Sequence, residues 1–326
     1  MKNILLLNAG TRNVLVRDFK KSLNGKARVI ATDSFDLAPS LYDADKYYVT
    51  KRWTEEGYWD EIKKIIKHNN VGLIVSLIDP ELAPLSNQKK ELEKLGVIIN
   101  TSKPETIFDC FDKYRTLLFI KENGFPWIKS YIDLDSIKKD LADGSLSFPL
   151  FSKPREGSGS AGIEKVYNIE RLETIFKEQT DVMVQEFMAG QEIGVDLYVD
   201  LISGEPVSIF AKKKLKMRAG ETDKSVSLKN EKLFTTVIEF AKKFGLKGAN
   251  DIDVFESNGE FYISEVNPRF GGGYIHAYAA GVDFPTLLIN NMNGIVNQPN
   301  IGNYKENHYM MKYFDIKVLN EGEKDV

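Results

Sequence analysis

The first third of the chain alternates continuous apolar runs with amphipathic segments. "NILLLNA" is an apolar run that ends before Gly10, "VLVRDFKKSL" follows at helical spacing, and "ARVIATD" is a second apolar run ending at Asp33. A strand, a helix and a strand in this order are typical of a βαβ unit. The alternation recurs in "WDEIKKIIKHNN", "VGLIVSLID", "LAPLSNQKKELEKLG" and "VIIN". This pattern predicts that residues 1 to about 100 form an open, largely parallel sheet with helices on both faces.

Polar residues stand where these strands are expected to end. Asn8 with Gly10, Asp33, and Asp79 with Glu81 each follow an apolar run. Ligands of open α/β sheets bind at the carboxyl ends of the strands, but ordinary turns also use Asn, Asp and Gly there. The pattern therefore leaves both a ligand role and a turn role open for these residues.

The remaining two thirds predict a mixture of strands and helices. "TIFDCFDKYRTLLFIKENGF" predicts a helix that ends at Gly124. From "FPLFSKP" onward, we expect a strand, a glycine loop, a strand ("GIEKVYN"), a helix ("IERLETIFKEQ") and a strand ("VMVQEFM"). The last third predicts two hairpins, with turns at "SGE" and "ESNGE", and the helix "NEKLFTTVIEFAKKFG" between them. These segments indicate α+β lobes that follow the α/β region.

Composition narrows the class of partner. A formal net charge of -3 with 28% charged residues argues against a nucleic-acid binder. The single cysteine, Cys110, cannot form an internal disulfide and is expected to be a core thiol. No segment reaches the roughly 20 apolar residues that would span a bilayer. We therefore expect a cytoplasmic protein with no nucleic-acid or membrane partner.

The segment "REGSGSAGI" satisfies G-x-G-x-x-G with Gly157, Gly159 and Gly162. The dinucleotide fingerprint requires a helix that opens at the third glycine, but the following "IEKVYN" is a β-type run. We therefore interpret it as a flap between two antiparallel strands, whose backbone N–H groups can cover nucleotide phosphates. A plain surface hairpin is the alternative. Lys153, just upstream, and Lys113, at a helix start in "FDKYRT", could reach the same phosphates.

The segment "SEVNPRFGGGYIHAYAAG" carries polar residues at every second position. Glu265, Asn267 and Arg269 would share one face of an extended chain, and Asp253 lies on the partner strand of the predicted hairpin. Carboxylate and amide oxygens together with nucleotide phosphates suit Mg²⁺, and Arg269 could neutralise charge on a transferring phosphoryl group. The three glycines would let a substrate approach the backbone closely. The alternative is an exposed strand face with a Glu265–Arg269 ion pair.

In this order, the lysines, the flap and "EVNPRFGGGYIHAYAAGVDFP" resemble the ATP-grasp enzymes. Within them, the chain is similar to single-module proteins that correspond to one half of the large subunit of carbamoyl-phosphate synthase. The resemblance covers nearly the whole chain and implies a combined α/β and α+β fold of ATP-grasp architecture. It implies an N-terminal open parallel sheet domain (the pre-ATP-grasp lobe) over residues 1–112. A small lobe with the glycine flap (113–188) and a C-terminal lobe with the metal site (189–326) would enclose the nucleotide.

The resemblance also implies roles for individual residues. Those that would hold the nucleotide are Lys113 and Lys153 on the phosphates, Gly157, Ser158, Gly159, Ser160 and Gly162 in the flap, Glu186, Phe187 and Met188 at adenine, and Glu192 on the ribose. Those that would hold magnesium are Asp253, Glu265 and Asn267, and Arg269 would be the phosphoryl-transfer arginine. The implied cofactors are ATP and two Mg²⁺ ions, with Mn²⁺ as a substitute.

The basic segment "KKKLKMRAGETDKSVSLKN", residues 212 to 230, is interpreted as a loop that lies where the family places substrate-facing residues. Arg218 is the preferred residue to hold a carboxylate substrate, and Lys214 is the second. A solvated charged surface is the alternative for this segment. His276 is open to either a substrate-facing or a structural role.

The resemblance implies a Mg-ATP-dependent ligase. A carboxylate would be activated as an acyl phosphate and attacked by an amine, with release of ADP and phosphate. The chain has a single module and no candidate nucleophile for glutamine hydrolysis, so carbamoyl-phosphate synthesis by this chain alone is not favoured. The alternatives are a carboxylate kinase of the carbamoyl-phosphate-synthase type, a non-catalytic ATP sensor, and a dinucleotide-dependent oxidoreductase, for which Gly10 lacks companion glycines. Expected partners are a small carboxylate and a small amine, with a possible homodimer.

Overall fold

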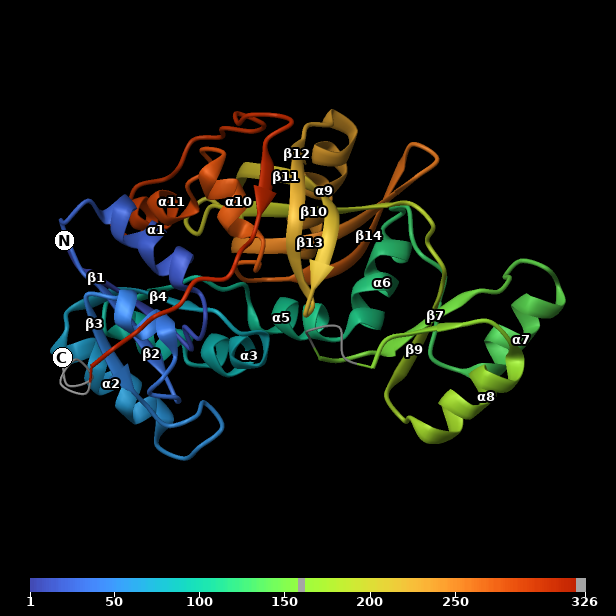
Figure 1. Ribbon diagram of the computed structural model, residues 1–326, viewed down its shortest axis with the longest axis horizontal. Coiled ribbons are helices and arrows are strands. Elements are labelled where there is room, and N and C mark those ends of the chain that lie inside the picture. Colours follow the sequence, from blue (N-terminus) through green and yellow to red (C-terminus); the bar gives the residue numbers. More distant parts are fainter. Residues whose placement is uncertain (158–161, 321–326) are drawn as a thin grey trace.

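The computed structural model describes residues 1–157 and 162–320, and Figure 1 shows three sheets arranged along the long axis of the molecule. The N-terminal sheet lies at one end and has the order β3-β2-β1-β4-β5, with every pairing parallel. Its strands are β1 (Asn3–Leu7), β2 (Val29–Asp33), β3 (Lys46–Val49), β4 (Val71–Ser76) and β5 (Ile98–Ile99). The predicted open parallel sheet is therefore confirmed.

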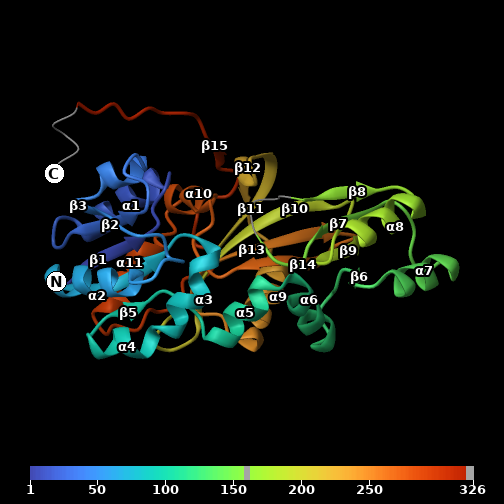
Figure 2. The ribbon, with the colours of Figure 1, turned by 90° about the horizontal axis from the view of Figure 1, so that it is seen from below.

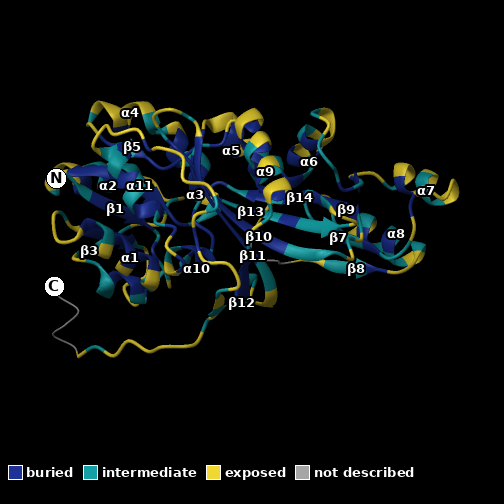
Figure 3. Cartoon of the chain, turned by 90° about the horizontal axis from the view of Figure 1, so that it is seen from above, coloured by how far each residue is buried: buried dark blue, intermediate teal, exposed yellow. Residues whose placement is uncertain are grey.

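Helices cover both faces of this sheet because successive residues of a strand point to opposite sides. In β1, Ile4 and Leu6 pack into one hydrophobic core with Phe19, and Leu5 and Leu7 pack into another with residues of α2 (Tyr58–His68). The elements around the sheet are α1 (Asn13–Leu23), the 3-10 helix η1 (Pro39–Asp43), α2 (Tyr58–His68), α3 (Asp79–Asn87) and α4 (Lys89–Lys94). Figure 3 shows the strands buried and the outer helix faces exposed.

The small lobe at the other end has an antiparallel sheet of order β6-β9-β7-β8. Its elements are β6 (Ser130–Tyr131), α7 (Leu134–Ala142), β7 (Leu150–Pro154), β8 (Glu164–Val166), α8 (Ile169–Glu178) and β9 (Val182–Glu186). β7 and β8 are antiparallel neighbours, and the strand β8 follows Gly162, as predicted. Ser158, Gly159 and Ser160 lie outside the described residues.

The central sheet has the order β14-β13-β10-β11-β12-β15, and Figure 2 shows it between the two end lobes. Its strands are β10 (Gln191–Val199), β11 (Pro206–Arg218), β12 (Glu221–Leu228), β13 (Gly248–Ser257), β14 (Glu260–Asn267) and β15 (Tyr309–Met311). The accompanying helices are α9 (Glu231–Phe244), α10 (Tyr274–Ala279) and α11 (Phe284–Met292). Both predicted hairpins are present, β10–β11 and β13–β14.

The chain returns to its N-terminal lobe after β14. α11 packs against α1 and β4, and the Ser22 hydroxyl of α1 donates to Asp283 at 3.0 Å. This packing places the end of β14 beside the carboxyl edge of the N-terminal sheet. The cleft between the lobes is therefore built from segments far apart in sequence.

Two local predictions were wrong. The helix expected to run to Gly124 is two helices, α5 (Pro104–Phe111) and α6 (Lys113–Glu122). Asp112 adopts an extended backbone, and its carboxylate accepts hydrogen bonds from the N–H groups of Tyr114 and Arg115, so it ends one helix and caps the next. A helix does begin at Lys113, as expected.

The basic segment 212–230 is not a loop, because most of it forms β11 and β12. The turn between these strands is Ala219-Gly220, with φ values of 50° and 76°. Two successive positive φ values are the geometry of the tight hairpin turn, and alanine rarely adopts it. The sequence therefore lacked the usual turn signal at this position.

Cys110 is a free, buried thiol, as expected of a core residue. Among the described residues, every helix is too short or too polar to cross a membrane.

Candidate active site

A cavity of about 900 Å³ lies where the three lobes meet, and every lobe contributes to its wall. The predicted site residues that line it are Lys113, Lys153, Gly157, Glu186, Phe187, Met188, Glu192, Arg218, Asp253, Glu265, Asn267 and Arg269. Gly162 lies outside this wall. A cavity of this size falls in the usual range for small-molecule sites, and the fold thus gathers residues from positions 113 to 269 around one space.

Two buried cations face the cavity from the small-lobe side. Lys113 is the first residue of α6, and its Nζ donates to the Gly157 carbonyl oxygen at 2.6 Å. Lys153, on β7, is 7% exposed, and burial lowers its pKa to about 8, while Glu265 opposes and Lys113 adds to this shift. A desolvated ammonium is stabilised by a nearby anion. The pair therefore suits a polyphosphate.

The segment after β9 forms an apolar part of the wall. Glu186, at the end of β9, accepts a hydrogen bond from the Lys129 N–H at 2.8 Å, which holds the segment before β6 against it. Phe187 and Met188 follow, and Phe151 and Phe255 line the same cavity. Flat, apolar walls beside backbone polar groups suit an aromatic base.

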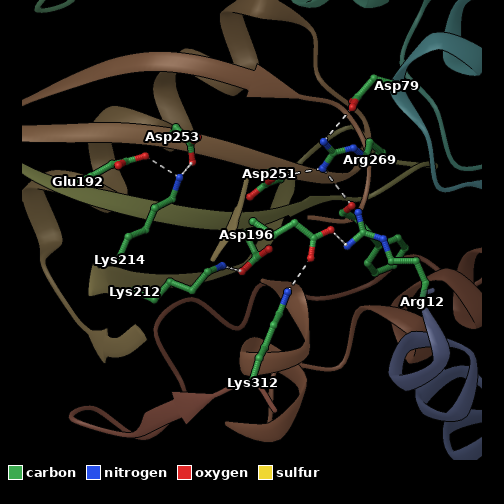
Figure 4. A network of polar contacts seen from close by, with 12 residues as sticks. Arg12, Asp79, Glu192, Asp196, Lys212, Lys214, Asp251, Asp253, Arg269 and Lys312 are labelled. Carbon is green, nitrogen blue, oxygen red and sulfur yellow. Dashed lines mark hydrogen bonds and ion pairs between the residues drawn. The ribbon is translucent and has the colours of Figure 1, made fainter. Parts of the chain in front are cut away.

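Glu192 lines the cavity near the metal residues and does not stand alone. Its carboxylate lies 2.7 Å from the Nζ of Lys214, and the same Nζ lies 2.6 Å from Asp253. Burial raises the pKa of Asp253, with Lys214 opposing the shift. Lys214 thus joins the predicted ribose residue to a predicted metal ligand, a link that we did not expect (Figure 4).

The β13–β14 register brings the predicted metal ligands together. Asp253 is opposite Glu265, and Asp251 is opposite Asn267, and directly opposed side chains of an antiparallel pair are neighbours. In the described part of the chain, no group of three His, Cys, Asp or Glu side chains is arranged to hold a metal ion. The predicted ligands are two carboxylates and one amide, a set that suits Mg²⁺ when phosphate oxygens complete its shell, and Asp251 adds a third carboxylate beside them.

Arg269 is held by carboxylates from two lobes (Figure 4). Its Nη2 lies 2.9 Å from Asp79 at the start of α3, and its Nη1 lies 3.3 Å from Asp251 on β13. The alternative Glu265–Arg269 ion pair is therefore not what fixes this guanidinium. Sequence reasoning missed Asp251, although its alternation with Asp253 in "NDIDV" was an available signal.

The three glycines after Arg269 leave room for charged side chains. A Cβ on Gly271 would lie 2.5 Å from the carboxyl carbon of Asp251, and one on Gly272 would lie 2.5 Å from that of Glu221. A Cβ on Gly273 would lie 2.8 Å from Cε of Lys212. Charged side chains therefore pack close to this backbone. Gly272 and Gly273 also line the cavity, so close approach of a substrate stays a prediction.

His276 lies outside the wall of the cavity. It is fully buried, its Nδ1 lies 2.8 Å from the Ser225 hydroxyl, and burial lowers its pKa to about 4. Arg218 lines the cavity, but its guanidinium pairs with Asp223 and lies 4.4 Å from the centre of the Phe314 ring. The structure thus buries the histidine away from the cavity, whereas Arg218 is part of the cavity wall.

Three lobes enclose a charged cavity of a size that suits a small-molecule ligand. The chain belongs to the ATP-grasp family, because residues 110–273 match the model of the ATP-grasp domain. Residues 4–100 match the model of a PylC-like N-terminal domain. The predicted family is therefore confirmed, together with the three-sheet fold.

Two relatives and one solved structure are similar to this chain. The carbamoyl phosphate synthase large chain of Clostridium beijerinckii is 26% identical over 264 residues, 76% of this chain but 23% of that protein. The D-alanine–D-alanine ligase of Fervidobacterium nodosum is 24% identical over 235 residues, 60% of this chain and 73% of the ligase. The chain thus spans about a quarter of the length of the synthase.

The structural match is to the biotin carboxylase domain of the 2-oxoglutarate carboxylase of Hydrogenobacter thermophilus. It has a TM-score of 0.75 at 16% identity and covers 94% of this chain and 73% of that one. That structure is a dimer in complex with MgADP, ADP and bicarbonate. At this identity, the match supports the fold.

Proposed function

We propose that this protein is a Mg-ATP-dependent ligase that activates a carboxylate as an acyl phosphate for attack by an amine, releasing ADP and phosphate. One observation carries the proposal. Two buried lysines, an opposed pair of carboxylates and a doubly held arginine face one cavity. These groups match the needs of phosphoryl transfer, which depends on positioning and on electrostatic stabilisation. Similarity to ligases in the same family supports the same reading.

The chain's own residues would act mainly by binding and orientation. Lys113 and Lys153 would neutralise the phosphates, and backbone N–H groups of the flap would cover them. The segment 186–188 would hold the base, and Glu192 the ribose. Residues 1–112, 113–188 and 189–326 would be the three domains that close on the nucleotide.

Asp253, Glu265 and Asn267 would hold two Mg²⁺ ions, with Mn²⁺ as a substitute. When bound, the metal would supply charge neutralisation between the phosphates and orientation of the transferred group. Arg269, fixed by its two carboxylates, would stabilise the developing charge on that group. Arg218 would hold the substrate carboxylate at the far end of the cavity.

The test is an ADP-release screen with Mg-ATP against panels of carboxylic acids and amines. We expect ADP and phosphate only when a matching acid and amine are both present. AMP as the product, or no nucleotide cleavage with any pair, would reject the acyl-phosphate route.

A matched pair of variants separates an enzyme from a nucleotide sensor. Glu265→Gln should lower turnover by at least about a hundredfold, because it removes a charge from the metal site. Glu260→Gln is the control, since this residue lies at the other end of β14 and pairs with Lys232. A sensor would lose only metal-linked nucleotide affinity in Glu265→Gln.

A further inference from the structure

An ion pair between two lobes lines the cavity beyond the metal strands. Arg12 follows β1, Glu221 begins β12, and the Arg12 Nη1 lies 2.9 Å from the Glu221 carboxylate. Figure 4 shows Arg12 reaching from the side of α1 toward the region of Arg269. The pair joins residues more than two hundred positions apart, so sequence reasoning did not single out either one.

Water reaches the Arg12–Glu221 pair, because the side chains are 23% and 42% exposed. Partial burial nevertheless lowers the pKa of Arg12, so a ligand that displaces Glu221 must supply another anion. Glu221 would stay in place if Arg12 turned away, because its other oxygen lies 2.7 Å from the Lys312 Nζ. Space beside the pair also depends on Gly272, whose Cβ would lie 2.7 Å from the Arg12 Nη1.

Other arginines at this end of the cavity are already engaged more fully. Arg269 is 11% exposed and holds two carboxylates. Arg218 pairs with a buried aspartate and covers an aromatic ring. Of the three arginines among the described residues that line the cavity, Arg12 is the one whose ion-pair partner, Glu221, is half-exposed and shared with Lys312.

We propose that Arg12 and Glu221 select an α-amino acid as the amine substrate of the ligase. The α-carboxylate would replace Glu221 on Arg12, and the ammonium group would replace Arg12 on Glu221, so one zwitterion satisfies both charges. A simple amine would leave Arg12 without its partner, and a simple acid would leave Glu221 paired with Lys312 alone. The proposal rests on the proposed function and concerns recognition only, with no added chemical step.

The test measures binding separately from turnover. Thermal shift and titration calorimetry with MgADP present would use the twenty standard L-amino acids and D-alanine as probes. Ethylamine, 4-aminobutyrate and cadaverine serve as the decarboxylated counterparts of alanine, glutamate and lysine, and propionate as the deaminated counterpart of alanine. We expect at least one amino acid to bind and its decarboxylated and deaminated counterparts to bind at least about tenfold more weakly.

Variants then assign the effect to the pair. Arg12→Gln and Glu221→Gln should each weaken the binding of the amino acid by at least about tenfold. The affinity of each variant for MgADP should stay within about twofold of the wild-type value. The controls are Arg17→Gln, which removes an ion pair with Asp43 from the same helix, and Glu260→Gln. Both controls should bind the amino acid as the wild type does.

Three outcomes would overturn the inference: no amino acid of the panel binds, simple amines bind equally well, or Arg12→Gln leaves the affinity unchanged. Failure of the ligase proposal looks different, because it would appear as absent ADP release while amino-acid binding and its dependence on Arg12 persist. Melting curves of each variant without ligand exclude misfolding as the cause.

Discussion

Nucleotide affinity should depend on pH through Lys153. Burial lowers the pKa of this lysine to about 8 from an ordinary value of 10.5, so its charge is lost as the pH rises through 8. At pH 9, about one molecule in eleven keeps the charge on Lys153. The affinity for ADP should therefore fall about tenfold for each pH unit above 8, which is a loss of about 1.4 kcal/mol of binding free energy per unit. Below pH 7, the lysine is protonated, and its contribution to affinity should be constant.

Calorimetry over pH 6.5 to 9.5 with Mg²⁺ held constant measures this affinity. At pH 8, about half of the free protein lacks the proton on Lys153, so ADP binding should take up about half a proton. Repeating the calorimetry in buffers of different ionisation enthalpy measures this proton uptake.

Substitutions at this position test the same reasoning. Lys153→Met should bind ADP about 10- to 100-fold more weakly at pH 7 and lose the dependence, and Lys153→Arg should keep its charge throughout. Lys177→Met, at an exposed position of α8, is the control and should follow the wild type. A flat wild-type profile, or the same fall in Lys153→Met, would refute the argument.

The sign for stability is the reverse of that for affinity. The unfolded chain binds the Lys153 proton more tightly than the folded chain between about pH 8 and 10.5, so this group's contribution to stability rises with pH in that window. Lys153→Met should accordingly unfold at a temperature no lower than that of the wild type at pH 7, because it removes a buried charge. This measurement separates lost binding from misfolding.

Two further substitutions test the positioning of Arg269 and the packing of the central sheet. Asp79→Asn removes one of the two carboxylates that hold Arg269, so kcat should fall about ten- to a hundredfold while ADP affinity changes little; an unchanged kcat would contradict the positioning role. Gly190→Ala would place a Cβ against the backbone carbonyl oxygen of Glu256. This substitution should lower the free energy of unfolding, measured with urea, by about 3 kcal/mol. Gly194→Ala is the control, because its Cβ would meet only the ends of lysine side chains, at 3.2 Å or more. It should lower the free energy of unfolding clearly less than Gly190→Ala does. Equal losses in the two variants would show that the contact with the backbone carbonyl is not the cause.

The amino-acid sequence determined the features that depend on neighbouring residues. Strand period and the Asn258-Gly259 turn, with φ values of 53° and 74°, predicted the β13–β14 hairpin. Once that hairpin forms, its register places Asp253 opposite Glu265, so the predicted metal ligands follow from local geometry. The parallel N-terminal sheet likewise followed from alternating apolar runs, because each βαβ unit is a local pattern.

The tertiary structure alone decided which charges meet. Arg269 pairs with Asp79, which lies 190 positions earlier, and Arg12 pairs with Glu221 across two lobes. A hydrophobic period of 2 or 3.6 residues indicates which face of a strand or helix is apolar. It does not indicate which other element packs against that face. The partners of Arg12 and Arg269 depend on how α11 and β14 return to the N-terminal sheet, and that arrangement is set by packing between lobes and not by any contiguous stretch of sequence.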